Sequence, residues 1–171
     1  MNIELTKWTK TKDVIPLLDV DTINGFLEKL PEVQLKKPIL DFTLKEFGEL
    51  LEDEEAYIRK LFNTRRLFTA LGRLKSYRRQ MKEINAFLKL YEMPQTKEER
   101  AAAQGIIFPD MVTKMVLSVI KFFGYKSIWR AERVKLRTYL MIFQEEASGM
   151  MYQRKYNDII NAQIKANSKK K

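Results

Sequence analysis

The sequence predicts an all-α protein, a helical bundle of about five or six helices with two long helices and an extended N-terminal arm. Its 6 glycines and 5 prolines are too few for the many tight turns of a sheet protein. The chain is 45% hydrophobic and 32% charged, which is a globular composition, and 171 residues can bury the core of one domain.

The N-terminal part predicts little regular structure. Residues 1–16 alternate loosely between apolar and polar side chains and, with no second strand to pair with, predict an arm that docks on the helices or on a neighbouring subunit. Asp19 or Asp21 is a candidate N-cap for a short helix that Pro31 closes. We therefore divide the chain into an N-terminal arm and short helix (1–42), a helical domain (43–164) and a disordered basic tail (165–171).

Two capping boxes mark helix starts. Thr43 is followed by Glu46, and Thr96 by Glu99, the spacing at which the paired side chains satisfy each other's backbone amides. Apolar residues at helical spacing follow the first box. The second box begins a short helix that Gly105 can end.

Residues 53–91 predict the first long helix. The stretch contains no proline and begins in an acidic run that favours a helix start. Its apolar residues do not keep one face, because successive groups drift by roughly a quarter-turn or more. The drift predicts either different partners along the helix or a break, at Asn63 and Thr64 or at Gly72.

The C-terminal half predicts two further helices and a short turn. Met111–Phe123 carries apolar residues around most of its circumference, so we expect a buried central helix that ends at Gly124. Residues 127–133 predict a turn or short helix. Residues 136–164 predict the second long helix, which is amphipathic with a weak point at Gly149. Four aromatic residues at helical spacing predict aromatic core rather than a base-stacking surface: Tyr139, Phe143, Tyr152 and Tyr156.

Positive charge is concentrated in one window. The formal net charge is +10, and residues 59–82 contribute +9 of it because they contain no acidic residue. Such a surface can track phosphates or meet an acidic protein, although an ordinary solvated helix face also carries Arg and Lys. The candidate partner-binding residues are Arg59, Lys60, Arg65, Arg66, Arg73, Lys75, Arg78, Arg79 and Lys82.

The chain contains few of the residues that catalysis uses. The absence of cysteine and histidine removes disulfides, thiolate nucleophiles, histidine acid–base chemistry and nearly every zinc site. Adjacent glutamates such as Glu145 and Glu146 point about 100° apart on a helix and do not form a carboxylate pair. We therefore expect a non-enzymatic protein with no catalytic, metal-binding or cofactor-binding residues. The longest apolar run, residues 115–123, is too short to span a bilayer, so we expect no membrane partner.

A pattern of caps, helix breakers and apolar spacings runs through the second half. It comprises residues 94–105, Phe108 with Pro109, the apolar helix, residues 129–132 and 136–140, and residues 152–156. In this pattern the chain from Pro94 onward resembles the small helical proteins of tailed-bacteriophage structural-gene clusters, especially tail-assembly proteins.

The resemblance implies an assembly or virion structural protein that works through helix-mediated contacts. Its partners would be virion or tail proteins or further copies of itself, in the host cytoplasm or in the virion. The alternative is a basic helical module that binds nucleic acid through residues 59–82.

Overall fold

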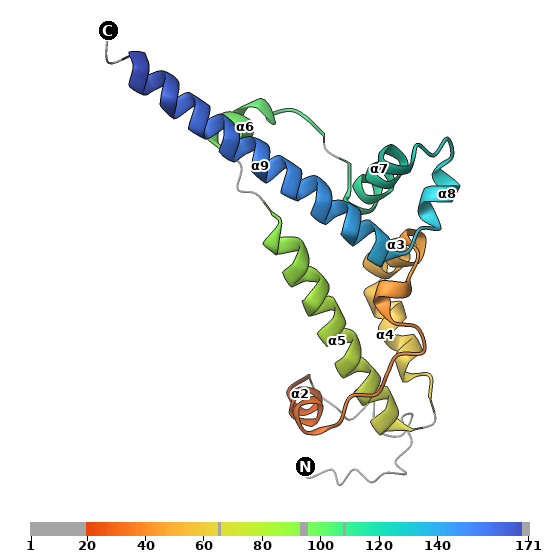
Figure 1. Cartoon of the computed structure of the whole chain (residues 1–171). Coiled ribbons are helices and arrows are strands. Elements are labelled where there is room, and N and C mark those ends of the chain that lie inside the picture. The colour runs from red at the N-terminus through yellow and green to blue at the C-terminus, as the bar shows by residue number, and fades with distance from the viewer. Residues whose placement is uncertain (1–19, 65, 93–95, 108, 169–171) are drawn as a thin grey trace.

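The computed structural model describes residues 20–64, 66–92, 96–107 and 109–168, and over these the protein is all-α, as predicted (Figure 1). The described residues form eight α-helices and no strand, whereas the sequence predicted five or six helices. The predicted arm over residues 1–16 lies outside the described residues. The elements are α2 (Val20–Lys29), the 3-10 helix η2 (Ile39–Asp41), α3 (Leu44–Glu52), α4 (Glu54–Phe62), α5 (Leu67–Leu90), α6 (Lys97–Ala102), α7 (Met111–Phe123), α8 (Ile128–Glu132) and α9 (Leu136–Ser168).

The first predicted long helix is two helices, so the prediction of one long element over residues 53–91 is wrong. The chain leaves the helix after α4 at Asn63 and Thr64, one of the two places that the apolar drift indicated. The Thr64 hydroxyl accepts a hydrogen bond from the Arg66 amide at 3.1 Å, which satisfies a backbone donor in the turn. α4 and α5 then pack side by side, each with its own apolar face (Figure 1).

The connector, which we define as residues 30–43 between α2 and α3, approaches α5 closely at Gly72. The Val33 amide donates a hydrogen bond to the Gly72 carbonyl at 3.1 Å. A Cβ at position 72 would lie 2.5 Å from Cγ2 of Val33 and 3.0 Å from the Pro31 carbonyl oxygen. Gly72 therefore does not break α5, and its missing side chain makes room for the connector.

We expect Gly72→Ala to lower the free energy of unfolding by about 1–3 kcal/mol, because the new methyl group displaces Val33 or the Pro31 carbonyl. Gly149→Ala in α9 is the matched control, since nothing lies within 4 Å of its added Cβ. That change should raise the free energy of unfolding by about 0.5–1 kcal/mol. Urea unfolding measures both, and a Gly72→Ala variant as stable as the wild-type protein would contradict the close approach.

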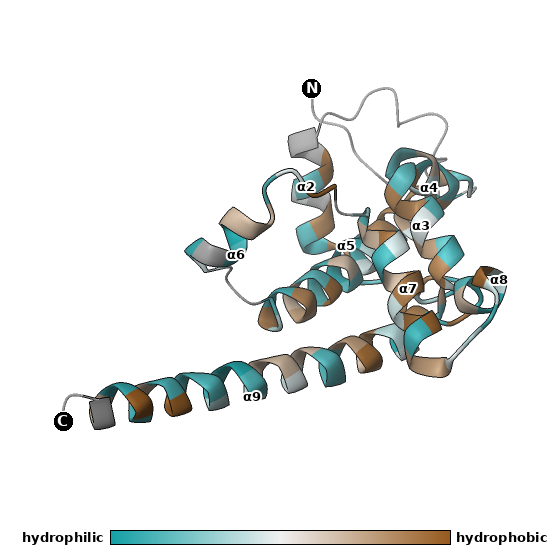
Figure 2. Ribbon diagram, turned by 90° about the horizontal axis from the view of Figure 1, so that it is seen from above, coloured by the Kyte–Doolittle hydropathy of each residue, from teal (hydrophilic) through white to brown (hydrophobic). Residues whose placement is uncertain are grey.

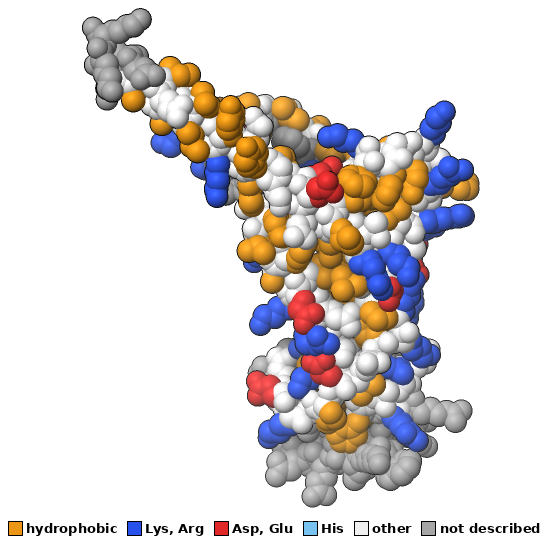
Figure 3. Space-filling model, in the orientation of Figure 1, with side chains coloured by type: hydrophobic (Ala, Val, Ile, Leu, Met, Phe, Trp, Pro, Cys, Tyr) orange, Lys and Arg blue, Asp and Glu red, His pale blue; other side chains and the backbone are white. Residues whose placement is uncertain are grey.

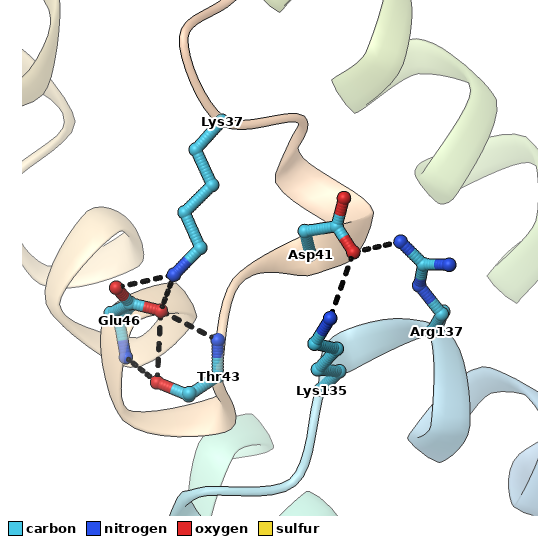
Figure 4. A network of polar contacts seen from close by, with 6 residues as sticks. All are labelled: Lys37, Asp41, Thr43, Glu46, Lys135 and Arg137. Atoms are coloured by element: carbon cyan, nitrogen blue, oxygen red, sulfur yellow. Dashed lines mark hydrogen bonds and ion pairs between the residues drawn. The ribbon is translucent and has the colours of Figure 1, made fainter.

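Both predicted capping boxes are present. The Thr43 hydroxyl accepts from the Glu46 amide at 3.2 Å, and the Glu46 carboxylate accepts from the Thr43 amide at 2.7 Å (Figure 4). Lys37 also donates to this carboxylate at 2.6 Å. Hydrogen bonds from Lys37 and from Thr43 lower the pKa of Glu46. Thr96 and Glu99 form the equivalent box at the start of α6.

Backbone hydrogen bonds and ion pairs join the connector to the start of α9. Two backbone hydrogen bonds, of 2.9 and 2.7 Å, join residues 42–44 to residues 134–136. Beside them the Asp41 carboxylate accepts hydrogen bonds from Lys135, at 3.3 Å, and from Arg137 (Figure 4). These contacts fix where α9 begins and the direction in which it leaves the rest of the protein. We call that rest, together with the first half of α9, the body.

The helix α7 has the predicted bounds, but the prediction that it is buried is wrong. Within it, Met115, Val116 and Val119 are buried, whereas Leu117 is 50% exposed and Phe122 is 47% exposed. The reason is that α7 lies on the outside of the body and packs on α3, α8 and α9 (Figure 1). Leu117, Phe122 and Phe123, on its remaining sides, are exposed.

The core lies where α3, α5, α7 and the first half of α9 converge. Leu44, Phe47, Leu71, Met115 and Leu136 are all at most 1% exposed and belong to one cluster. The connector and α2 add further buried residues to the same cluster. Residues before and after position 42 therefore share one core.

Candidate protein-interaction surface

The second half of α9 projects from the body as a single helix (Figures 1 and 2). Every side chain between positions 148 and 166 is exposed, except for three that are half-buried. α9 runs to Ser168, so residues 165–168, which were predicted as part of a disordered tail, continue the helix. We call residues 148–168 the arm, and from here on the word refers to this segment and not to the N-terminal arm predicted over residues 1–16.

The apolar face of α9 changes side where the arm begins. In the first half, Leu136, Leu140 and Ala147 form a buried stripe against the body. At 100° per residue, Tyr156 lies about 160° round the helix from Leu140. The apolar residues of the arm thus form a face centred roughly half a turn from the buried stripe. We call this the arm face, and it consists of Tyr152, Tyr156, Ile159, Ile160 and Ile164.

Most of the arm face is open to solvent. Tyr152 is 70% exposed, Tyr156 50%, Ile159 57% and Ile164 60%. Hydrophobic side chains line the arm in the space-filling view (Figure 3). The rings of Tyr152 and Tyr156 stack on each other, with centroids 6.4 Å apart. The predicted aromatic core therefore holds for Tyr139, which is buried, and for Phe143, which packs against the core, and is wrong for the two tyrosines of the arm.

The opposite side of the arm is polar and contacts α6. Arg154 donates to the Glu99 carboxylate of α6 at 2.6 Å. The hydrogen bond from the Thr96 amide, together with that from Arg154, lowers the pKa of Glu99. Asp158 and Lys165 lie on the same polar side by helical spacing. α6 therefore contacts the arm on its polar side, while four of the five arm-face side chains stay exposed.

Part of the predicted basic site is used inside the molecule. Lys75 donates to two carbonyl oxygens at the end of α2, at 3.3 and 2.9 Å. Arg78 donates to Asn24 of α2 at 2.8 Å, and Arg79 donates to Glu32 of the connector at 2.8 Å. These three cations attach α2 and the connector to α5.

Other members of the basic site lie apart from one another. Arg59 pairs with Glu55 at 2.6 Å, one turn earlier in α4. Arg66 is the N-cap residue of α5 and is exposed, as is Lys82 further along that helix. Arg65 lies outside the described residues. The structure thus spreads the basic window over several surfaces.

Lys60 and Arg73 line the same open cavity, of about 650 Å³, between the connector, α3, α4 and α5. Nε of Arg73 is buried and has no hydrogen-bond partner. Three carboxylates also line the cavity, those of Glu46, Glu49 and Asp53, and they nearly balance its four basic side chains. The cavity therefore does not have the strong positive charge that a polyanion would select.

Among the described residues, no cluster of carboxylates is arranged to hold a metal ion. The helices of that same part of the chain include none with the length and apolar character needed to cross a membrane. Comparison of the chain with protein-family models, with curated proteins and with solved structures finds no match.

Proposed function

We propose that this protein is a non-enzymatic assembly or structural protein, of the kind encoded in tailed-bacteriophage structural-gene clusters, and that it binds other protein subunits through the arm. The observation that carries the proposal is the solvent-open apolar face on a projecting helix. Contiguous exposed apolar surface on a water-soluble fold is characteristic of interaction sites. An amphipathic helix that binds through one face is a common recognition mode.

The physical state of the arm supports the same conclusion. A single helix of about 20 residues is marginal in water without tertiary packing. The arm also contains Gly149 and several asparagine, tyrosine and isoleucine residues, which are weaker helix formers than Ala or Leu. A partner that covers the arm face would stabilise the helix as well as bury apolar surface.

Co-expression with the structural genes that neighbour its own is expected to yield a complex that co-purifies with this protein. Ile159→Glu places a charge in the middle of the arm face and should abolish co-purification. Asn161→Glu adds the same charge about 160° away round the helix and should leave the complex intact. Circular dichroism checks that both variants remain helical. Failure of the wild-type chain to bind any structural protein would count against the proposal.

The nucleic-acid alternative is tested by measuring DNA binding, and it predicts a different effect of the substitutions. Duplex DNA would bind the purified protein at low salt, and the affinity would fall steeply with salt concentration. Arg66→Glu with Arg73→Glu would weaken that binding, whereas Ile159→Glu would not.

A further inference from the structure

We infer that the arm pairs with the arm of a second copy of this chain, antiparallel and face to face. The inference rests on the proposed function and deepens it, because it identifies the first partner of the arm. Three features of the arm carry it: the spacing of its apolar residues, the sizes of the side chains along it, and the distribution of charge.

The spacing is that of a helix–helix seam. A row made of three arm-face residues followed by Gln163 and Ala166 advances at intervals of four, three, four and three positions, which is the alternation that lets two helices interlock side chains. Ile160 borders this row, and Ile164 lies further round the helix. The seam consists of Tyr152, Tyr156, Ile159, Gln163 and Ala166.

The side-chain sizes select the antiparallel direction. With the Ile159 residues of the two copies opposite each other, Tyr152 of one copy faces Ala166 of the other, and Tyr156 faces Ala162, beside Gln163. Large side chains then meet smaller ones at both ends, which fills the interface evenly. A parallel pair would place tyrosine against tyrosine at one end and alanine against alanine at the other.

Charge along the seam favours an identical partner over a charged one. Lys155 is the basic residue at its border, and in the antiparallel register it faces the uncharged amide of Gln163 in the second copy. An acidic protein or a nucleic acid would find no row of cations on this face to pair with. The arm face of a second copy would cover these apolar residues without burying an unpaired charge.

The charge of the whole chain also selects the antiparallel direction. Each copy has a formal net charge of +10, so two bodies held side by side would repel each other. The arm is roughly 30 Å long at 1.5 Å per residue. Antiparallel arms place the bodies at opposite ends of the pair, further apart than the screening length of about 8 Å at physiological ionic strength.

The area suits a reversible dimer. Four large side chains of the arm face are at least half exposed and together present on the order of 500 Å² of apolar surface per copy. Two such faces together offer at most about 1,000 Å², which is the lower limit for a specific interface. We therefore expect a concentration-dependent equilibrium between monomer and dimer.

Sedimentation equilibrium of the full chain over a range of concentrations tests the pairing. We expect Ile159→Glu to raise the dissociation constant of the dimer at least tenfold and Asn161→Glu to leave it within twofold of wild type. A wild-type chain that stays monomeric at every concentration would overturn the inference. So would a dimer that Ile159→Glu does not weaken, since its interface would then lie elsewhere.

Cross-linking tests the direction, because the natural chain contains no cysteine. A mixture of Tyr152→Cys and Ala166→Cys chains should form a mixed disulfide on mild oxidation, whereas Tyr152→Cys chains alone should not. A disulfide between two Tyr152→Cys chains, without the mixed product, would show a parallel pair and overturn the antiparallel arrangement.

The two proposals fail in distinguishable ways. A chain that is monomeric alone, yet binds a structural protein in a manner that Ile159→Glu abolishes, would overturn self-pairing and leave the proposed function in place. An arm-dependent dimer that binds no other structural protein would do the reverse.

Discussion

Replacing Tyr77 by alanine is expected to lower the free energy of unfolding by about 3–5 kcal/mol, the loss typical of a buried aromatic side chain. Tyr77 is 1% exposed and lies on α5, with its ring centroid 5.2 Å from that of Tyr57 on α4. Tyr57 in turn meets Phe42 of the connector at 5.8 Å. Removing the Tyr77 ring therefore loosens three segments at once.

Tyr77→Phe is the matched control because it keeps the ring and removes only the hydroxyl. That hydroxyl donates to the Glu54 carboxylate at 2.8 Å. Glu54 is exposed, so water can replace the lost donor, and we expect a loss of about 1 kcal/mol. Urea unfolding of both variants gives the comparison. Equal losses would mean that the hydrogen bond, rather than ring packing, joins α4 to α5.

Features that depend on neighbouring residues could be predicted from the sequence. Thr43 and Thr96 each cap a helix through a glutamate three residues later. Gly124 ends α7 with a left-handed φ of 64°, which glycine adopts without strain. Each of these depends on a few adjacent residues and none depends on how distant elements pack.

Burial depends on distant elements, which is why the prediction for α7 failed. Its apolar residues surround the helix, but α3, α8 and α9 cover only part of its circumference. The contacts that the basic residues make also depend on distant elements. Lys75, Arg78 and Arg79 contact residues 24–32, which lie 45 to 54 positions earlier in the chain. Charge pattern alone does not identify partners at such separations.

The arm, by contrast, could have been recognised from local information. Treating residues 136–164 as one amphipathic helix merges two different apolar faces. Taken separately, the two halves differ by roughly half a turn, as Leu140 and Tyr156 show. A single body can cover one such face of a straight helix, so the change of side indicates a second partner for the C-terminal half.

The second large effect concerns alkaline pH. Burial, and secondarily the nearby Glu146 carboxylate, raises the pKa of Tyr139 to about 12 from its ordinary value of 10. Burial and the Glu54 carboxylate raise the pKa of Tyr77 as well. The folded protein therefore holds these phenolic protons more tightly than the unfolded chain does. Their contribution to stability is fully present below pH 10 and is lost as pH rises through 10 toward the folded values.

For Tyr139 the loss should amount to about 2 kcal/mol between pH 9 and pH 11.5, since each unit of pKa difference corresponds to about 1.4 kcal/mol and the folded form is itself beginning to ionise near its pKa. Urea unfolding at pH 9 and at pH 11.5 measures it. Lysines also titrate in this range, so the informative quantity is the difference between variants. Tyr139→Phe should reduce the alkaline loss, whereas Tyr152→Phe, at a side chain that is 70% exposed, should leave it unchanged. An identical alkaline loss in all three proteins would show that Tyr139 does not cause it.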